Sequence, residues 1–329
     1  MRTYRMGFAN SAPRFDDFNL VLQSLQIWTT RADAAIVNTE VPWDTLFSGT
    51  PAKDYVARHY AGLVDFYRSK NFKLWVYIDP QNGLDRANDA LELVAMGKSI
   101  ADPEAQALYR KFVLAMDSVL KPEHLGLALE TNLIRAAASS AIYQGVKKAA
   151  NDAAAELAGR GTTAKLSVSV QVDVAWGNLG GGGYVGVAQD FADFPFIEEL
   201  GLSSYPYFGI SSPDQLPDNY YSKLVESKSL PVFVSEGGWS SGSVSLAGTS
   251  FTSSPQLQAA YIKRQRALLD AAKAIAWFQL TFTDIDIASL TPPIPENLGY
   301  FIYLGLVDIN LQPKPALSAW DEVFAVPLK

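Results

Sequence analysis

Acidic side chains that end or follow short apolar runs are the residues of this sequence with the clearest chemical potential. Glu40, Asp79, Glu130 and Glu236 each stand in such a place. Two carboxyl groups that flank a glycosidic bond can hydrolyse it, because one protonates the leaving oxygen while the other attacks the anomeric carbon or activates water there. We expect Glu130 and Glu236 to form such a pair.

The composition excludes or disfavours several other catalytic mechanisms and binding partners. The 329 residues contain no cysteine and two histidines, which excludes thiol nucleophiles and cysteine-bound zinc and leaves little for a histidine-based metal site. A formal net charge of −7 argues against a nucleic-acid partner, since such binding relies on clustered Lys and Arg. No apolar stretch is long enough to span a bilayer, so no membrane partner is expected.

Hydrophobic periodicity predicts eight short strands, most of them separated by longer amphipathic segments. The predicted strands are Tyr4–Ala9, Ala34–Val37, Lys73–Ile78, Leu125–Leu129, Leu166–Val174, Leu200–Ser204, Pro231–Ser235 and Ala274–Leu280. The clearest helical segments are Pro51–Ser69, Pro103–Leu120, Ala136–Leu157 and Ser254–Ala272. The run Gly180–Gly183 predicts a flexible loop after the fifth strand.

This alternation predicts a parallel (β/α)8 TIM barrel, with residues 1–329 as a single catalytic domain. A doubly wound open sheet is disfavoured because Gly7–Asn10, after the first strand, lacks the glycine spacing of a dinucleotide-binding turn. In a barrel, residues after the fourth and seventh strands can face each other across the mouth, which favours the pair Glu130 and Glu236.

Other residues at the strand ends are candidates for substrate binding. Tryptophan faces can stack on sugar rings, and four tryptophans fall at or near strand ends: Trp43, Trp176, Trp239 and Trp277. Glu40 and Asp79 could bind sugar hydroxyls or anchor their own loops, and Glu40 is also the reserve candidate for the general acid.

Several motifs, in the same order along the chain, resemble those of a clan of (β/α)8 retaining glycoside hydrolases. Pro231–Trp239 looks like the nucleophile strand of this clan, and Leu200–Pro206 resembles its sixth-strand motif, whose tyrosine, here Tyr205, approaches the nucleophile. The segments Ala276–Phe278, with Trp277 under the sugar, and Gly305–Ala316 are similar to the end of the clan's barrel. The likeness is to the endo-β-galactanase and β-1,3-glucanase branches. It implies catalytic glutamates after strands four and seven, with Glu130 as the general acid/base and Glu236 as the nucleophile.

One position departs from the clan. The clan places an asparagine directly before the acid/base, where it holds the sugar 2-hydroxyl, but Leu129 stands there in this chain. Asn132 lies two residues after Glu130, and on an extended segment it would share a face with that residue. We therefore expect Asn132 to take over this contact.

Three functions stay open at this point. The first is a retaining β-glycoside hydrolase that needs no cofactor or metal and acts on a polysaccharide or oligosaccharide by double displacement. We expect this enzyme to be a monomeric protein. The second is a carbohydrate-binding barrel without catalysis, which the missing asparagine supports. The third is a metal-dependent hydrolase, which would use Glu40, Asp79, Glu130 and Asp173. The cellular location is open between export, with the leader removed, and the cytoplasm, with export preferred.

Overall fold

The computed structural model describes residues 1–179, 181–246 and 249–329; the predicted loop Gly180–Gly183 therefore lies partly outside the described residues. Within the described residues, one sheet has eight strands in the order β1-β10-β7-β6-β5-β4-β3-β2. Its strands are β1 (Arg5–Phe8), β2 (Ala34–Glu40), β3 (Lys73–Asp79), β4 (His124–Gly126), β5 (Lys165–Gln171), β6 (Glu199–Ser204), β7 (Val232–Gly237) and β10 (Ala276–Gln279). The pairs β1–β10, β10–β7, β3–β4 and β4–β5 are parallel. Parallel strands in this order, joined by helical connections, define the (β/α)8 TIM-barrel fold class, so this prediction is confirmed.

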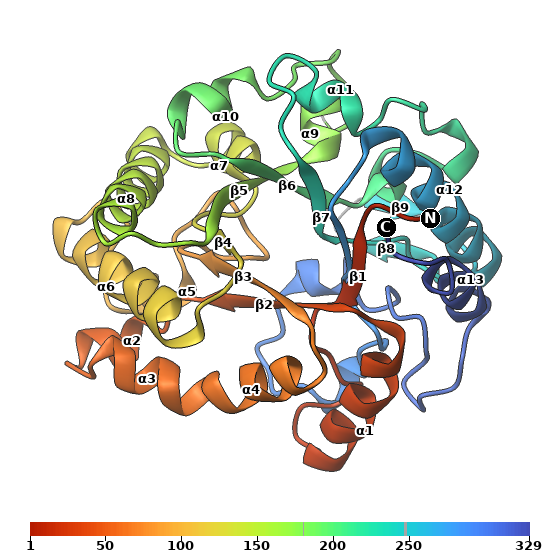
Figure 1. Cartoon of the computed structure of the whole chain (residues 1–329), viewed down its shortest axis with the longest axis horizontal. Coiled ribbons are helices and arrows are strands. Elements are labelled where there is room, and N and C mark those ends of the chain that lie inside the picture. The colour runs from red at the N-terminus through yellow and green to blue at the C-terminus, as the bar shows by residue number, and fades with distance from the viewer. Residues whose placement is uncertain (180, 247–248) are drawn as a thin grey trace. The chain divides into compact units, whose positions relative to one another are not determined.

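Helices occupy the connections between the strands (Figure 1). The α-helices are α1 (Phe18–Trp28), α2 (Trp43–Phe47), α3 (Ala52–His59), α4 (Ala61–Ser69), α5 (Leu91–Ala95), α6 (Pro103–Leu120), α7 (Thr131–Ala137), α8 (Ser140–Gly159), α9 (Val172–Trp176), α10 (Ala188–Asp193), α11 (Ser222–Val225), α12 (Pro255–Ala272) and α13 (Pro315–Phe324). Short 3-10 helices are η1 (Thr29–Arg31), η2 (Pro206–Phe208), η3 (Pro213–Gln215), η4 (Ile287–Ser289) and η5 (Glu296–Tyr300).

Some element boundaries differ from the sequence-based expectations. The fifth strand ends at Gln171, and α9 takes up the residues that were expected to continue it. The helix expected from residue 136 begins at Ser140, because the Ser139 hydroxyl accepts the N–H of Ile142 and so starts a new helix after the separate α7. Hydrophobic periodicity predicts that these elements exist, but it does not reveal the hydrogen bonds that set their boundaries.

Two compact units make up the chain: residues 37–171 with 187–201, and residues 1–36 with 172–186 and 202–329. In the first of these units, β3, β4 and β5 are parallel neighbours, and α6 packs beside α8 (Figure 1). Its core is apolar, with Val76, Leu125 and Val168 almost completely buried. The expected single domain stays a prediction.

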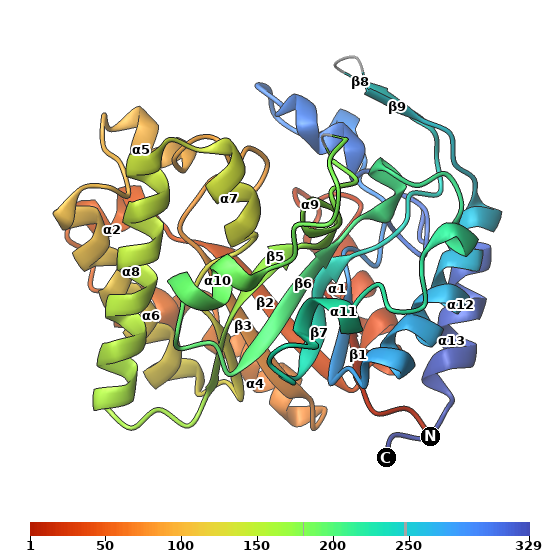
Figure 2. The same ribbon diagram turned by 90° about the horizontal axis from the view of Figure 1, so that it is seen from above.

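The other unit contains β1, β10 and β7, with α12 packed against α13 (Figure 1). Two short strands of this unit, β8 (Val244–Leu246) and β9 (Thr249–Phe251), pair antiparallel (Figure 2). Strand β8 also contacts η5. Arg2 bridges to Leu328, so the first and last strand-like segments of the chain lie side by side. No helix in the part of the chain that the structure describes is long and apolar enough to cross a membrane.

Candidate active site

Glu130 follows β4 and starts helix α7 in an unusual backbone conformation. Its φ of 49° lies in the left-handed region, which residues other than glycine seldom adopt. The Ser169 hydroxyl of β5 accepts the Glu130 N–H at 2.9 Å, and the Glu130 carbonyl accepts the N–H of Ile134 at 3.0 Å. Such strained residues persist only where their surroundings hold them, and they concentrate at functional sites.

The Glu130 side chain is 7% exposed and is bound by an arginine that sequence reasoning missed. Arg86 donates from Nε to Glu130 Oε2 at 2.8 Å and from a terminal nitrogen to Asp79 Oδ2 at 2.6 Å. Arg86 is itself buried, so this three-residue group is a desolvated ion-pair cluster. The only sequence signal for Arg86 was its place in the loop that follows Asp79.

Asp79 and Glu40 both have raised pKa values. Burial is the main cause of the raised pKa of Asp79, and the Arg86 charge and hydrogen bond oppose it. Desolvation of the carboxyl end, followed by the charge of Asp79, raises the pKa of Glu40, whose Oε1 accepts the Gly83 N–H at 3.2 Å. The Glu40 side chain as a whole is exposed, so water screens this effect. A raised pKa suits a general acid, and Glu40 remains the reserve candidate.

The expectation for Asn132 is wrong. Asn132 is 3% exposed and its amide group serves the main chain: Nδ2 donates to Gln171 O at 2.8 Å, and Oδ1 accepts the N–H groups of Gln171 and Leu133 at 2.8 and 2.9 Å. Residues 131–137 are helical and not extended, so Asn132 does not share a strand face with Glu130. Its side chain ties α7 to the end of β5.

Glu236 is the next-to-last residue of β7 and is half-buried. Its Oε1 accepts the Ser203 hydroxyl of β6 at 3.1 Å. Gly237 follows with a φ of 155°, and a Cβ there would collide with the main-chain oxygen of Ser204. The Gly238 N–H donates to this same oxygen at 3.1 Å, so the chain turns closely over the end of β6 directly after the carboxylate.

Tyr205, which follows β6, is 3% exposed and packs by its ring edge against Tyr207, Phe208 and Phe301. This aromatic group holds the ring from several sides. The expected approach of Tyr205 to Glu236 stays a prediction.

Three of the four candidate tryptophans are enclosed, so their expected role as open sugar platforms is wrong. Trp277 is 1% exposed because its indole packs against Tyr4 and, at 4.5 Å between ring centroids, against Trp320 of α13. Trp239 is 1% exposed and its Nε1 donates to Ser253 Oγ at 3.0 Å, and Trp43 has no exposed surface. They stabilise the packing between elements.

Trp176 keeps an accessible part. It is half-buried at the end of α9, with one face stacked on the Tyr220 ring at 5.6 Å between centroids, and its Nε1 donates to the main-chain oxygen of Tyr220 at 2.8 Å. The ring of Tyr184, which is 40% exposed, meets it edge-on at 5.2 Å. The Lys223 ammonium lies 4.9 Å from the Trp176 ring centroid and 4.0 Å from that of Tyr184. Trp176 is therefore the tryptophan of the four that can still contact a sugar.

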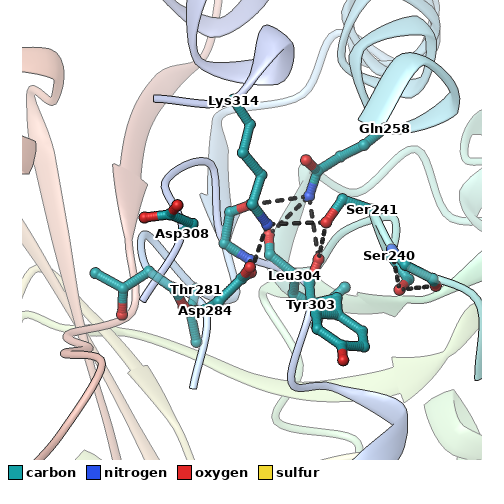
Figure 3. Close-up of polar contacts among 12 residues, drawn as sticks. Ser240, Ser241, Gln258, Thr281, Asp284, Tyr303, Leu304, Asp308 and Lys314 are labelled. Carbon is teal, nitrogen blue, oxygen red and sulfur yellow. Dashed lines mark hydrogen bonds and ion pairs between the residues drawn. The ribbon is translucent and has the colours of Figure 1, made fainter. Parts of the chain in front are cut away.

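A buried polar network supports the segment after Glu236 (Figure 3). The Lys314 ammonium donates to Asp284 Oδ1 at 2.5 Å, to Ser241 Oγ at 2.8 Å and to the Gly305 oxygen at 2.9 Å. Gln258 Nε2 donates to the main-chain oxygens of Trp239 and Gly305, each at 3.0 Å. The network joins the loop after β7, the loop after β10 and the start of α13.

Within the described residues, no group of three or more His, Asp or Glu side chains is arranged to hold a metal ion. Asp173, one of the four carboxylates of the metal hypothesis, accepts the Tyr220 hydroxyl at 2.7 Å and the Asn178 amide at 2.9 Å. Two others, Asp79 and Glu130, share Arg86.

The fold is that of a (β/α)8 barrel, and solved structures similar to it are glycoside hydrolases. No family model matches the sequence, and no curated protein matches it significantly. The exo-β-1,4-mannosidase Op5Man5 from Opitutaceae bacterium strain TAV5 is 16% identical, with a TM-score of 0.69 over 98% of this chain and 60% of its own. GH5_18 from Bifidobacterium longum subsp. longum, in complex with Manβ1-4GlcNAc, is 14% identical, with a TM-score of 0.65 over 99% of this chain and 80% of its own.

A third similar structure is the β-glucuronidase of Ruminococcus gnavus. It is 13% identical, with a TM-score of 0.59 over 98% of this chain and 50% of its own length. At these identities the likeness establishes the fold class, and the branch suggested by the sequence motifs is not among these three names.

Proposed function

We propose that this chain is a retaining β-glycoside hydrolase that acts on an oligosaccharide or polysaccharide. One observation carries the proposal: two glutamates, Glu130 and Glu236, come at or just after the carboxyl ends of β4 and β7, two parallel strands of one sheet. Enzymes of this fold class carry their active sites at that end of the strands. The glycosidase names of the similar structures give further support.

In the proposed reaction Glu236 is the nucleophile. Its carboxylate attacks the anomeric carbon and forms a glycosyl-enzyme, while Glu130 gives a proton to the departing oxygen. Glu130 then takes a proton from water, which attacks the anomeric carbon and releases the sugar with its original configuration. The Ser203 hydroxyl holds one oxygen of Glu236, which fixes the direction in which this carboxylate can attack.

The experiment is a survey of aryl β-glycosides and polysaccharides, with the anomer of the first product followed by proton NMR. The panel includes β-galactans and β-1,3-glucans, which the resemblance of the sequence motifs suggests. It also includes β-mannosides and β-glucuronides, which the names of the similar structures suggest. We expect turnover of at least one class with retention. An initial product of inverted configuration would contradict the mechanism.

A second function, carbohydrate binding without catalysis, has its own supporting observation. Leu129 stands where the clan has its sugar-binding asparagine, and the Asn132 amide is committed to the main chain of Gln171 and Leu133. Saturable binding of an oligosaccharide, together with no turnover of any aryl glycoside, would favour this function over hydrolysis.

A further inference from the structure

A lysine and two aromatic rings form an accessible cluster in the unit that contains residues 172–186 and 202–329. Its members are Trp176 at the end of α9, Tyr184, and Lys223 of α11. The Lys223 ammonium lies 4.0 Å from the centroid of the Tyr184 ring and 4.9 Å from that of the Trp176 ring. Trp176 and Lys223 are half-buried and Tyr184 is 40% exposed, so a molecule in solution can contact all three side chains.

Hydrogen bonds to the main chain hold this cluster in a fixed arrangement. Trp176 Nε1 donates to the main-chain oxygen of Tyr220 at 2.8 Å, and the Tyr184 hydroxyl donates to that of Lys223 at 3.2 Å. The N–H groups of the two residues after Tyr184 both donate to the Ala175 oxygen, at 2.9 and 3.0 Å. Both rings are therefore tied to the segment that carries the lysine, and a site that is ordered before its ligand arrives loses less entropy on binding.

The positive charge of the cluster is turned toward rings and not toward an acidic side chain. In the part of the chain that the structure describes, the Lys223 ammonium has no carboxylate partner. The rings attract the charge, but they offer no oxygen to its N–H groups. Burial, followed by the charge of Glu226, raises the pKa of Tyr184, so Glu226 acts on the cluster without pairing with its lysine. The ammonium can therefore donate to an anionic group of a bound molecule.

A sugar ring that carries an anionic group matches this combination of side chains. The C–H faces of a sugar pack on aromatic rings, and an anionic group accepts the charge-assisted hydrogen bonds that an ammonium donates. A neutral sugar would use the rings but would leave the N–H groups of Lys223 to water. Because the chain has a formal net charge of −7, which repels anions in general, a positively charged group beside two rings gives this one place a preference for them.

We infer that Trp176, Tyr184 and Lys223 form a subsite for an acidic sugar unit, whose carboxylate or sulfate group Lys223 binds. The inference names the substrate class, an acidic oligosaccharide or polysaccharide, and it rests on the proposed function for its link to hydrolysis. Helix α9 begins at Val172, directly after β5 ends at Gln171, and the carboxyl ends of the strands are where enzymes of this fold class bind their substrates.

The test compares the affinity of acidic oligosaccharides with that of their neutral forms. The probes are galacturonan and hyaluronan oligosaccharides, each with its carboxyl-reduced form, and a sulfated carrageenan oligosaccharide with its desulfated form. Calorimetric titration uses the full chain with Glu236→Ala, so that no probe is consumed. We expect at least one acidic probe to bind about tenfold more tightly than its neutral form, with an advantage that shrinks as salt is added. Equal affinities within every pair would overturn the inference.

The kind of probe that shows the advantage identifies the anionic group. An advantage confined to the galacturonan and hyaluronan pairs assigns a carboxylate to the subsite, and one confined to the carrageenan pair assigns a sulfate. The neutral form of each probe also reports on the fold of a variant, since its binding needs the rings and not the charge.

Four substitutions test whether Lys223 causes the preference. Lys223→Met keeps the apolar stem, so the advantage of the acidic probe should fall below about twofold while the neutral form binds as before. Lys223→Arg should restore most of the advantage. Glu226→Gln removes a negative charge at an exposed position and should strengthen acidic binding by about twofold, which is the opposite effect.

The control is Lys263→Met, which makes the same change of charge on an exposed residue of α12. It should leave the advantage unchanged. A loss in Lys263→Met equal to that in Lys223→Met would show that net charge causes the preference, and the subsite would have to be abandoned.

The proposed function and this subsite can fail separately. If the wild type hydrolyses no glycoside while a preference for acidic probes that depends on Lys223 is present, the proposed function fails and the subsite stands. If the wild type hydrolyses neutral glycosides with retention and no acidic preference is found, the inference fails and the function stands.

Discussion

Glu236 and Glu130 have different surroundings, as their different proposed roles require. Glu236 is half-buried and one of its oxygens accepts a neutral hydroxyl, that of Ser203, at 3.1 Å. Glu130 is more enclosed and accepts a charged donor, Arg86. A nucleophile must be aimed at the anomeric carbon, whereas an acid/base must be held while its proton comes and goes.

Glu236→Ala should abolish turnover of every glycoside, because no covalent intermediate can form. Glu130→Ala should slow breakdown of the glycosyl-enzyme but leave its formation nearly unchanged for an activated aryl glycoside, whose leaving group needs no proton. Azide should then restore the rate and give a β-glycosyl azide from a β-substrate, which NMR identifies. Wild-type rates in Glu130→Ala on poor substrates would exclude Glu130, and Glu40 would be tested next.

The tryptophans give a matched pair of substitutions. Trp277→Ala removes an indole that is 1% exposed between Tyr4 and Trp320, so the free energy of unfolding should fall by about 3 to 5 kcal/mol while the folded fraction binds carbohydrate normally. Trp176→Ala should do the reverse, with oligosaccharide binding weakened several-fold and a smaller loss of stability. Denaturant melts and calorimetric titration measure both. Equal binding losses in the two variants would contradict this assignment.

At the residue scale, the sequence predicted where the carboxylates stand but not what surrounds them. Glu130 and Glu236 come at or just after strand ends, and in a parallel sheet the carboxyl ends of all strands lie at the same side, where barrel enzymes carry their active sites. Alternation along a strand says which residues share a face, but not whether that face meets the helices or the barrel interior. The exposure of the Trp277 ring was therefore predicted wrongly. Arg86 was not predicted as a site residue because its partners, Asp79 and Glu130, lie on other elements of the chain.

At the element scale, the loops after β7 and β10 depend on the buried pair Asp284 and Lys314 (Figure 3). Burial raises the pKa of Asp284 to about 6, although Lys314 and the Gly305 N–H oppose this. Burial also lowers the pKa of Lys314, against the attraction of Asp284. Both shifts favour the neutral forms, which means that desolvation outweighs the attraction within the pair.

This pair predicts a definite dependence of stability on pH. Between about pH 4, the unfolded pKa of an aspartate, and about pH 6, the folded chain holds a proton on Asp284 that the unfolded chain releases. The free energy of unfolding contributed by Asp284 should therefore fall as pH rises through this window, by at most about 1.4 kcal/mol per unit.

Asp284→Asn should remove that slope in urea melts at pH 4, 5, 6 and 7. The exposed Asp270 of α12 offers a control, since Asp270→Asn makes the same change of formal charge at the surface. A slope for Asp284→Asn equal to that of the wild type would show that Asp284 is not the group responsible.

Elements with strong periodicity were predicted well, and those defined by tertiary contacts were not. The strand Lys73–Ile78 and the helix Pro103–Leu120 agree with β3 and α6 to within a residue. The hydrophobic pattern that marks a buried strand or a long amphipathic helix lies within the segment itself, so it can be recognised from the sequence. The pair β8 and β9 and the 3-10 helices after residue 280 were not predicted. They are held by contacts with distant parts of the chain: the hydroxyl of Tyr300, in η5, donates to the main-chain oxygen of Leu246, in β8, at 3.0 Å.

At the scale of the whole molecule, the strand order agrees with the sequence prediction, and similar folds occur at 13 to 16% identity. In that order β4 and β7 are separated by β5 and β6. If Glu130 and Glu236 act together with retention, a crystal structure should show their carboxyl groups about 5 to 5.5 Å apart. A separation of roughly 6.5 to 9.5 Å would indicate inversion, and a much larger one would end the assignment.

The most direct test of the central claim is the mass of the covalent intermediate. Glu130→Ala, incubated with an activated aryl β-glycoside from the class that the wild type hydrolyses, should gain the mass of one glycosyl unit, and peptide sequencing should place it on Glu236. The double variant with Glu236→Ala should gain nothing. A label on another residue, or wild-type turnover with no label in Glu130→Ala and an inverted product, would contradict the account.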